Sequence, residues 1–261
     1  MSLLEAHNLD AGYGKIPILQ NVSFEIEAGE LVGVLGANGC GKTTLLKAVC
    51  GILSHEGECL LEGVCLEGLS PRKIAALCSY IPQRSGVEID ISVLDVVLMG
   101  FNPRLGLLEY PNVQMKEEAR KALAAVGLGG REAENYLSLS EGQKQLCILA
   151  RTLVSRGRLL LLDEPESALD FRYRDRMLSL LRTWVAEGDR GALVTLHDPG
   201  LALRYCDRLL LLDGGGVSGV ICPAIDDLTV MEQALSVIYG KVSLLRCRDR
   251  GGNARLVMLK E

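Results

Sequence analysis

The stretch that decides the fold of this chain is Gly36-Ala37-Asn38-Gly39-Cys40-Gly41-Lys42-Thr43. The apolar run Leu31 to Leu35 precedes it and indicates a buried parallel strand, and Thr44 to Val49 begins a helical pattern that Gly51 ends. Because its glycines allow backbone conformations closed to other residues, successive N–H groups can converge on phosphate oxygens at the positive end of the helix. The stretch therefore predicts a phosphate-binding loop within an α/β fold.

Two side chains of this loop have chemistry of their own. The ammonium of Lys42 suits the β and γ phosphates of a nucleotide, and the hydroxyl of Thr43 suits Mg²⁺. An ordinary glycine-rich turn is the alternative, and it explains none of the motifs farther along the chain. The residues that we expect to contact a nucleotide here are Gly36, Asn38, Gly39, Cys40, Gly41, Lys42, Thr43 and Thr44.

A second strand ends in two adjacent carboxylates. The leucine-rich run from Arg158 leads into Asp163-Glu164, at the strand end where open α/β sheets hold ligands. Asp163 is suited to orient Mg²⁺ and its waters, and Glu164 to polarise the water that attacks a γ-phosphate. The pair lies beside the phosphate loop if the two strands are neighbours. A helix-capping cluster is the alternative, since Pro165 and Glu166 also favour a helix start, but capping leaves the leucine strand unexplained.

Composition limits the classes of protein to consider. The 261 residues are 48% hydrophobic, which can build a sizeable core, and the net charge of −5 argues against a nucleic-acid partner. Apolar runs are far shorter than the ~20 residues that span a bilayer, so we expect a chain that is neither secreted nor membrane-spanning. Nine scattered cysteines without a CxxC pair indicate reduced thiols.

The remaining pattern predicts an α/β nucleotide-binding core, at about 1–88 and 158–261, with a β-rich N-terminal edge and a helical subdomain inserted at about 89–157. Strands are expected within 2–35 and at 58–61, 79–81, 158–163, 192–196 and 208–213. Helices are expected from residue 71 and at 115–126, 141–154, 171–186, 199–205 and 227–239, followed by a hairpin at 242–259.

One more motif, Leu139-Ser140-Glu141-Gly142-Gln143, lies about twenty residues before the leucine strand. It forms a loop before a helix from Lys144 to Val154, so its N–H groups and the Ser140 hydroxyl suit a phosphate. A plain helix cap by Ser140 is the alternative.

Residues 3 to about 215 contain all of these motifs. Taken in their order along the chain, the motifs resemble those of the ATPase subunit of ATP-binding cassette (ABC) transporters. By this resemblance the chain has a phosphate loop at Gly36–Thr43, a Q-loop glutamine at Gln83, the signature at Leu139–Gln143, the Walker B strand at Leu159–Glu164, the D-loop at Ser167–Asp170, a switch histidine at His197, and an adenine-stacking ring at Tyr13.

The resemblance implies hydrolysis of ATP with Mg²⁺. It assigns catalytic roles to Lys42, Gln83, Glu164 and His197, and it assigns the binding of Mg²⁺ to Thr43, Gln83 and Asp163. It implies a head-to-tail homodimer, in which the signature of one subunit completes the ATP site of the other. Further nucleotide contacts are then expected from Tyr13, Ser140, Gly142, Gln143 and Asp170. From the residues alone, Gln83 could be a polar loop residue and Tyr13 could pack on its own turn.

Two positions depart from the family's usual pattern. The signature has Glu141 where many members have Gly, and Glu166 stands where Thr is more usual. Neither departure removes a residue assigned to catalysis. Glu141 adds negative charge near a nucleotide phosphate, which could weaken ATP-driven closure.

The stretch from Ile91 to Gly106 is similar to the corresponding segment of importers for iron-siderophore, haem and cobalamin. This similarity implies a transmembrane permease, an extracytoplasmic substrate-binding protein that acts indirectly, and a peripheral position on the cytoplasmic face of the membrane, with iron-siderophore as the first choice of cargo. We expect the apolar face of Val93 to Met99 to receive the permease, or else to pack inside the helical subdomain.

Two other classes of cassette ATPase remain as alternatives. One is a soluble ATPase of iron-sulfur cluster assembly, which shares the catalytic motifs. The other acts on ribosomes or DNA and usually has two cassettes or long coiled-coil insertions, whereas this chain has one cassette and no basic stripe.

Overall fold

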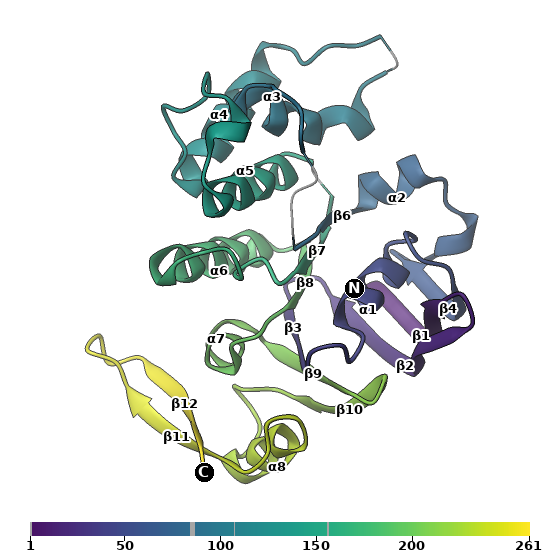
Figure 1. The fold of residues 1–261 in the computed structure, drawn as a ribbon, viewed down its shortest axis with the longest axis vertical. Helices are drawn as coiled ribbons and strands as arrows, with labels where there is room; N and C mark the ends of the chain where they lie inside the picture. The colour runs from purple at the N-terminus through teal and green to yellow at the C-terminus, as the bar shows by residue number, and fades with distance from the viewer. Residues whose placement is uncertain (1, 84–86, 107, 156) are drawn as a thin grey trace.

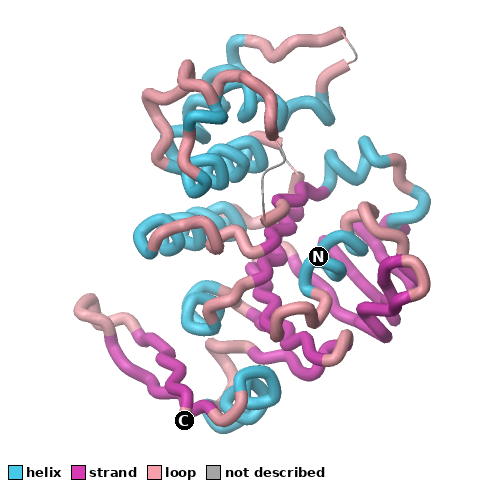
Figure 2. Tube along the Cα trace, viewed as in Figure 1, coloured by secondary structure: helices cyan, strands magenta, loops and turns pink. Residues whose placement is uncertain are grey.

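The computed structural model of the chain describes residues 2–83, 87–106, 108–155 and 157–261. Its strands form two sheets and a separate hairpin (Figures 1 and 2). The first sheet is antiparallel, in the order β2-β1-β4-β5, and consists of β1 (Ser2–Tyr13), β2 (Ile16–Glu27), β4 (His55–Leu61) and β5 (Val64–Cys65).

The second sheet has six strands in the order β10-β9-β3-β8-β7-β6. They are β3 (Leu31–Gly36), β6 (Cys78–Ile81), β7 (Leu159–Asp163), β8 (Gly191–Thr195), β9 (Arg208–Asp213) and β10 (Gly216–Ile221). All pairs are parallel except β9 with β10. The ligand-binding edge of this sheet is therefore the end at which β3, β7 and β8 all finish.

The helices are α1 (Lys42–Val49), α2 (Pro71–Leu77), α3 (Val93–Leu98), α4 (Val113–Val126), α5 (Glu141–Leu153), α6 (Phe171–Ala186), α7 (Pro199–Tyr205) and α8 (Leu228–Tyr239), with single 3₁₀ turns or short runs at η1 (Leu66–Gly68), η2 (Met99–Arg104) and η3 (Tyr136–Ser138). In Figure 1, α3, α4 and α5 lie together above the second sheet, and α1 lies between the two sheets.

The leucine run of β7 is explained by burial on both faces of its sheet. Leu159 and Leu161 pack with α1 and the first sheet, whereas Leu160 and Leu162 pack in the core formed with the helical subdomain and α6. A parallel strand covered on both sides has no face for polar residues. Asp163 is thus the first position at which this strand reaches the edge of the sheet.

The predicted architecture is confirmed: an α/β core with an N-terminal antiparallel sheet and a helical subdomain. Most predicted elements are present within one or a few residues. β5 and β10 were not predicted, because β5 has two residues and β10 follows the glycines Gly214 and Gly215 and contains two more. The domain limits at residues 88 and 158 stay a prediction.

The expectation of an exposed docking face at Val93 to Met99 is wrong. Val93, Val96 and Val97 have no exposed surface, and Leu98 is 7% exposed. Because α3 packs against α4 and α5, its apolar side chains fill the interior of the helical subdomain. The alternative that we left open, internal packing, is the one that the structure supports.

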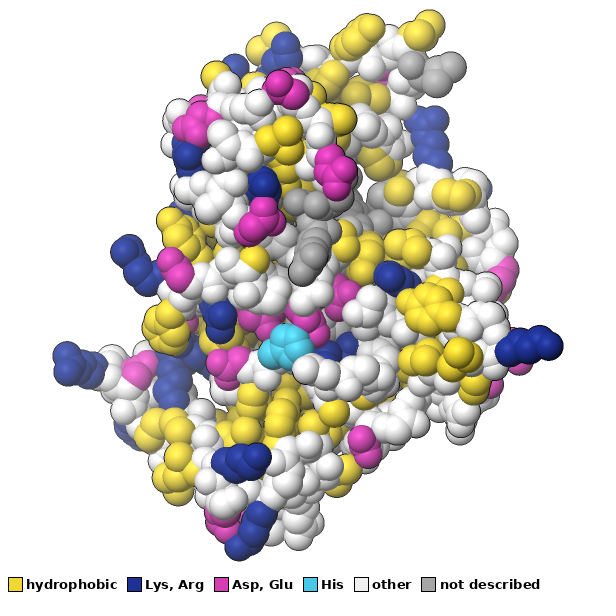
Figure 3. Space-filling model, viewed as in Figure 1, with side chains coloured by type: hydrophobic (Ala, Val, Ile, Leu, Met, Phe, Trp, Pro, Cys, Tyr) yellow, Lys and Arg dark blue, Asp and Glu magenta, His cyan; other side chains and the backbone are white. Residues whose placement is uncertain are grey.

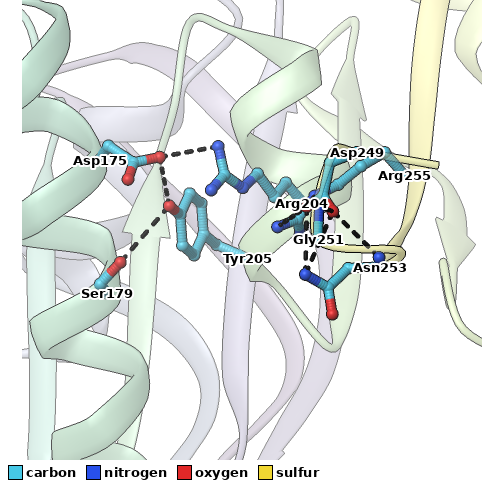
Figure 4. Close-up of polar contacts among 8 residues, drawn as sticks. All are labelled: Asp175, Ser179, Arg204, Tyr205, Asp249, Gly251, Asn253 and Arg255. Carbon is cyan, nitrogen blue, oxygen red and sulfur yellow. Dashed lines mark hydrogen bonds and ion pairs between the residues drawn. The ribbon is translucent and has the colours of Figure 1, made fainter. Parts of the chain in front are cut away.

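The C-terminal hairpin, β11 (Val242–Arg248) and β12 (Ala254–Lys260), lies against α7 and α8. Its turn is held by Asp249, whose Oδ1 accepts hydrogen bonds from the backbone N–H groups of Gly251 at 2.9 Å and Asn253 at 3.0 Å (Figure 4). The neighbouring Tyr205 hydroxyl and Arg204 both contact Asp175, which ties α7 to α6 (Figure 4). None of the described helices combines the length and the apolar composition that crossing a bilayer requires.

Candidate nucleotide-hydrolysis site

The phosphate loop runs from the end of β3 into α1, as its glycines predict. Gly41 has a φ of 108°, and a Cβ on it would lie 2.6 Å from Leu19 Cδ2. A Cβ on Gly36 would lie 2.5 Å from both the Leu212 carbonyl oxygen and Cys40 Sγ. Both positions therefore require glycine for the loop to turn this tightly.

Lys42 is buried, with 5% of its surface exposed, and its side chain folds back over the loop. Its Nζ donates hydrogen bonds to the carbonyl oxygens of Gly36 at 2.9 Å and Ala37 at 3.3 Å. The ammonium is therefore held inside the curve of the loop, where bound phosphate would meet it.

Asp163 lies at the end of β7 and is 2% exposed. Its Oδ1 accepts a hydrogen bond from Thr195 Oγ1 at 3.0 Å, and its Oδ2 accepts one from the Tyr80 hydroxyl at 3.3 Å. Burial, followed by the nearby charge of Asp163, raises the pKa of Tyr80 well above its usual range, so this hydroxyl keeps its proton and donates.

The two strands that carry the loop and the carboxylates are not neighbours, since β8 lies between β3 and β7. The condition that the two strands be neighbours is therefore not met. Glu164 still reaches the loop, and its Oε1 lies 3.9 Å from Lys42 Nζ. The carboxyl ends of all three strands meet at one edge, so a single intervening strand leaves the pair within side-chain reach.

Glu164 is the point at which the predicted catalytic residues meet. Its Oε2 accepts a hydrogen bond from Gln83 Nε2 at 2.7 Å and lies 2.6 Å from His197 Nε2. Its backbone has a φ of 46°, in the left-handed region that non-glycine residues rarely adopt, and its N–H donates to Thr195 Oγ1 at 2.8 Å. The surrounding contacts thus hold the backbone of Glu164 in a conformation that costs energy.

These residues border a hollow of about 410 Å³. Its lining consists of Ile18, Asn38, Gly39, Gly41, Lys42, Thr43, Thr44, Gln83, Glu164 and His197. In Figure 3, acidic, basic and histidine side chains gather at the middle of the drawn face, below the helical subdomain. A larger hollow, of about 830 Å³, lies against the β1–β2 hairpin and has no phosphate-loop residue in its lining. The chemistry therefore selects the smaller one.

The remaining predicted contacts lie outside this hollow. Tyr13, at the end of β1, is 48% exposed and does not border it. Ser140 caps α5: its Oγ accepts from the Gln143 N–H at 3.3 Å, and Gln143 Oε1 accepts from the Ser140 N–H at 3.0 Å. Asp170 caps α6 by accepting from the Tyr173 N–H at 3.1 Å. The capping alternative for Ser140 thus holds within one chain, and the roles of these residues toward a nucleotide stay predictions.

The signature loop packs against the D-loop of its own chain. A Cβ on Gly142 would lie 3.1 Å from the Ala168 carbonyl oxygen and 3.3 Å from Leu169 Cδ2. The unusual Glu141 forms an ion pair with Lys144, with 2.7 Å between Oε1 and Nζ. The added negative charge is therefore partly balanced where it stands.

Sequence reasoning missed two contacts of the site, Thr195 and Tyr80. Thr195 joins the backbone of Glu164 to the carboxylate of Asp163, and it is the single polar residue in the otherwise apolar β8. A buried hydroxyl at the end of a parallel strand was the signal that could have found it. Nothing in the sequence around Tyr80 distinguishes it from an ordinary strand tyrosine.

Comparison with known proteins agrees with this geometry. The family described as "ABC transporter" matches residues 19–167. The hemin import ATP-binding protein HmuV of Pseudomonas fluorescens (strain Pf0-1) is 38% identical over 263 residues, which cover 98% of this chain and 99% of the relative. A probable iron chelatin transport ATP-binding protein of Helicobacter pylori (strain ATCC 700392 / 26695) is 35% identical over 212 residues, which cover 80% and 83%.

Among solved structures, an inward-facing metal-chelate type ABC transporter has a chain that superposes with a TM-score of 0.83 at 26% identity, covering 100% of this chain and 99% of that one. A dimeric cassette, MJ0796, bound to ADP and phosphate has a TM-score of 0.75 at 24% identity over 84% of this chain, which shows the shared fold. The chain therefore belongs to the family of ABC transporter ATP-binding proteins, whose activity is ATP hydrolysis coupled to transport.

Proposed function

We propose that this chain is the ATP-hydrolysing subunit of an importer that takes up an iron chelate through a separate permease. The observation that carries the proposal is its 38% identity, over 98% of its length, to a hemin import ATP-binding protein. The convergence of Lys42, Gln83 and His197 on Glu164 supplies the chemistry that such a subunit requires.

The reaction that this geometry supports is transfer of the γ-phosphoryl group of ATP to water. The oxygen of water bonds to the γ-phosphorus while the bond to the β–γ bridging oxygen breaks, which leaves ADP and phosphate. Gln83 and His197 occupy Oε2 of Glu164, whereas Oε1 lies 3.9 Å from Lys42 and remains to accept the proton of water. Lys42 neutralises charge on the phosphates, and His197 contacts the γ-phosphate.

The donor set fits Mg²⁺. Thr43 offers a hydroxyl, Asp163 a buried carboxylate and Gln83 an amide oxygen, and Mg²⁺ prefers oxygen ligands. The described residues contain no group of three or more His, Cys, Asp or Glu side chains that could hold a metal ion alone. Mg²⁺ in such sites takes its other ligands from phosphate and water, and it neutralises the charge that develops on the phosphates.

The same proposal includes a homodimer. Ser140, Gly142 and Gln143 lie at the N-terminus of α5, outside the hollow that holds the catalytic residues of their own chain. N–H groups at a helix start bind anions, so these residues are available to the nucleotide of a second copy. We assign Tyr13 and Asp170 to contacts with the nucleotide, Tyr13 by stacking on adenine.

Because α3 is buried, we assign the permease contact to a different segment, which follows α3 in the chain. Leu108 and Tyr110 are each 86% exposed, and Val113 is 78% exposed. The preceding residues are fixed to the core, because Arg72 of α2 donates to the carbonyl oxygens of Pro103 at 3.2 Å and Leu105 at 2.6 Å. We assign these three apolar side chains to a permease segment, which places the chain peripherally on the cytoplasmic face of the membrane.

The cargo is a metal chelate, and the relatives divide between hemin and iron chelatin. The test is to delete the gene and restore it with the wild type or with Lys42→Ala, in cells supplied with haem or with a ferric siderophore as the iron source. Wild type should restore growth on one of the two chelates, and Lys42→Ala on neither.

The rival assignment predicts a different pattern. If the chain were a soluble ATPase of iron-sulfur cluster assembly, deleting its gene should leave uptake of both chelates intact and should reduce the activity of iron-sulfur enzymes. The protein itself should not associate with membranes that contain the permease. The contact surface is tested by Leu108→Asp, which should keep ATPase activity but lose co-purification with those membranes.

A further inference from the structure

Glu166 occupies a buried position between the two catalytic segments. It follows β7, is 2% exposed, and accepts through its backbone oxygen the N–H of Leu169 in the D-loop at 3.0 Å. Its side-chain Oε1 accepts the backbone N–H of His197 at 2.9 Å. The second oxygen, Oε2, is buried and has no hydrogen-bond partner among the described residues.

A carboxylate in this place is costly. Burial raises the pKa of Glu166 above its usual value, although its hydrogen bond with the His197 N–H acts in the opposite direction. The charged or titratable side chains that interact with it are Glu164, His197 and the buried thiol of Cys206, and no ion pair compensates it among the described residues. A buried carboxylate in which only one of the two oxygens accepts a hydrogen bond requires an explanation.

The reason lies in the short segment that carries His197. β8 ends at Thr195, and Asp198 already caps α7 by accepting from the N–H groups of Gly200 at 2.8 Å and Leu201 at 3.2 Å. Only Leu196 and His197 lie between. The imidazole of His197 is 43% exposed, so its side chain is not fixed by packing. The flanking residues are held by the Leu196 N–H, which donates to the Val34 carbonyl oxygen at 3.1 Å, and by the Asp198 cap, while the hydrogen bond to Glu166 holds the backbone of His197 itself.

We propose that Glu166 is a positioning residue for ATP hydrolysis, which sets the place of the His197 imidazole relative to Glu164 by holding the His197 backbone. The inference rests on the roles proposed above for His197 and Glu164. Glu166 itself does not border the hollow that Lys42, Glu164 and His197 line. The contact joins the end of β7 to the end of β8, so it also links the D-loop to the switch histidine within one chain.

Two variants of similar size separate the hydrogen bond from packing. Glu166→Gln keeps an acceptor oxygen for the His197 N–H, whereas Glu166→Met keeps the volume and removes it. Loss of a hydrogen bond to a charged group should lower kcat roughly tenfold in Glu166→Met, with KM for ATP within about twofold of wild type, because the imidazole acts in the transition state. Glu166→Gln should keep kcat within about twofold.

A spectroscopic readout makes the test independent of activity. The chain has 3 histidines, so the ring signals of ¹⁵N-histidine-labelled protein can be assigned by substituting each in turn. Glu166→Met should shift the His197 signals and leave those of His7 and His55 in place, while Glu166→Gln should leave all three near wild type. Unmoved His197 signals in Glu166→Met would overturn the inference.

The double variant separates this inference from the proposed function. Glu166→Met should reduce turnover no further when His197 is already Ala, and a further tenfold fall would overturn the inference. Wild-type turnover of His197→Ala alone would instead remove the proposed role of His197. Should Glu166→Met fail to fold, Glu166→Asp draws the acceptor back by one methylene and must shift the same signals; unchanged signals would again overturn the inference.

Discussion

The two motifs that we assign to nucleotide phosphate differ in how far one chain completes them. At the phosphate loop, Lys42, Gln83 and His197 all reach Glu164, and their side chains border one hollow. At the signature, Ser140 and Gln143 cap their own helix, and Ser140 is exposed. The difference teaches that the catalytic constellation is built by contacts within the chain, whereas the signature is presented outward, where the second copy that we propose would meet it.

The largest effect is expected at the centre of the complete half. Glu164→Gln keeps the shape of the side chain but removes the charge that polarises water, so hydrolysis should fall by roughly 10² or more while ATP still binds. Phosphate release and ATP affinity of purified variant and wild type measure the two properties separately. Near-normal turnover would take Glu164 out of the role assigned to it.

The outward half should respond in a different way. Ser140→Arg, made in the Glu164→Gln protein, should leave binding of ATP to the single chain nearly intact but abolish ATP-dependent dimerisation. A bulky cation at this exposed cap blocks a second copy without touching the hollow of its own chain. Sizing by light scattering with and without ATP measures this, and Ser138→Arg, two residues earlier and also exposed, is a matched control. A double variant that still dimerises in ATP would refute the assignment of the signature.

The complete half was largely predictable from the sequence, because its motifs are short and their chemistry is local. The phosphate loop and the Asp163-Glu164 pair could be located from glycine spacing and a leucine strand. The order of the strands could not, since nothing local indicates that β8 separates β3 from β7. The apolar pattern of α3 was equally ambiguous, because a buried face and a docking face have the same periodicity, and only packing against α4 and α5 decides between them.

The helical subdomain that presents the signature depends on that packing. Val97→Asp places a carboxylate in a site with no exposed surface, which should destabilise the fold by about 3 kcal/mol or more. Chemical denaturation measures the free energy of unfolding. Val113→Asp is the matched control, since Val113 is 78% exposed and should lose less than about 0.5 kcal/mol. Equal stability of the two variants would contradict the buried position of α3.

The smallest effect concerns Cys40 in the phosphate loop. Its side chain is half-buried, and burial raises the pKa of its thiol above the usual value, an effect that the nearby Lys42 charge reduces. Because the thiolate is the reactive form, alkylation should be slower at pH 7.5 than that of an unperturbed thiol, and it should still rise with pH where an unperturbed thiol has levelled off. Bound ATP should slow it, while the exposed Cys247 should be indifferent to ATP. Mass spectrometry of the two peptides measures both rates, and equal labelling of Cys40 with and without ATP would contradict its place beside the phosphates.

The claim that one chain completes the ATP site of another is tested most directly by mixing two impaired variants. Lys42→Ala disables the phosphate loop, and Ser140→Ala removes the signature hydroxyl without adding bulk that blocks pairing, so each homodimer alone should release much less phosphate than wild type. In a mixed dimer both defects fall in one site and leave the other intact, so an equal mixture should recover up to about a quarter of wild-type activity, as half of the dimers are mixed and have one working site each. A mixture no more active than its separate components would show that the signature does not complete the site of the partner.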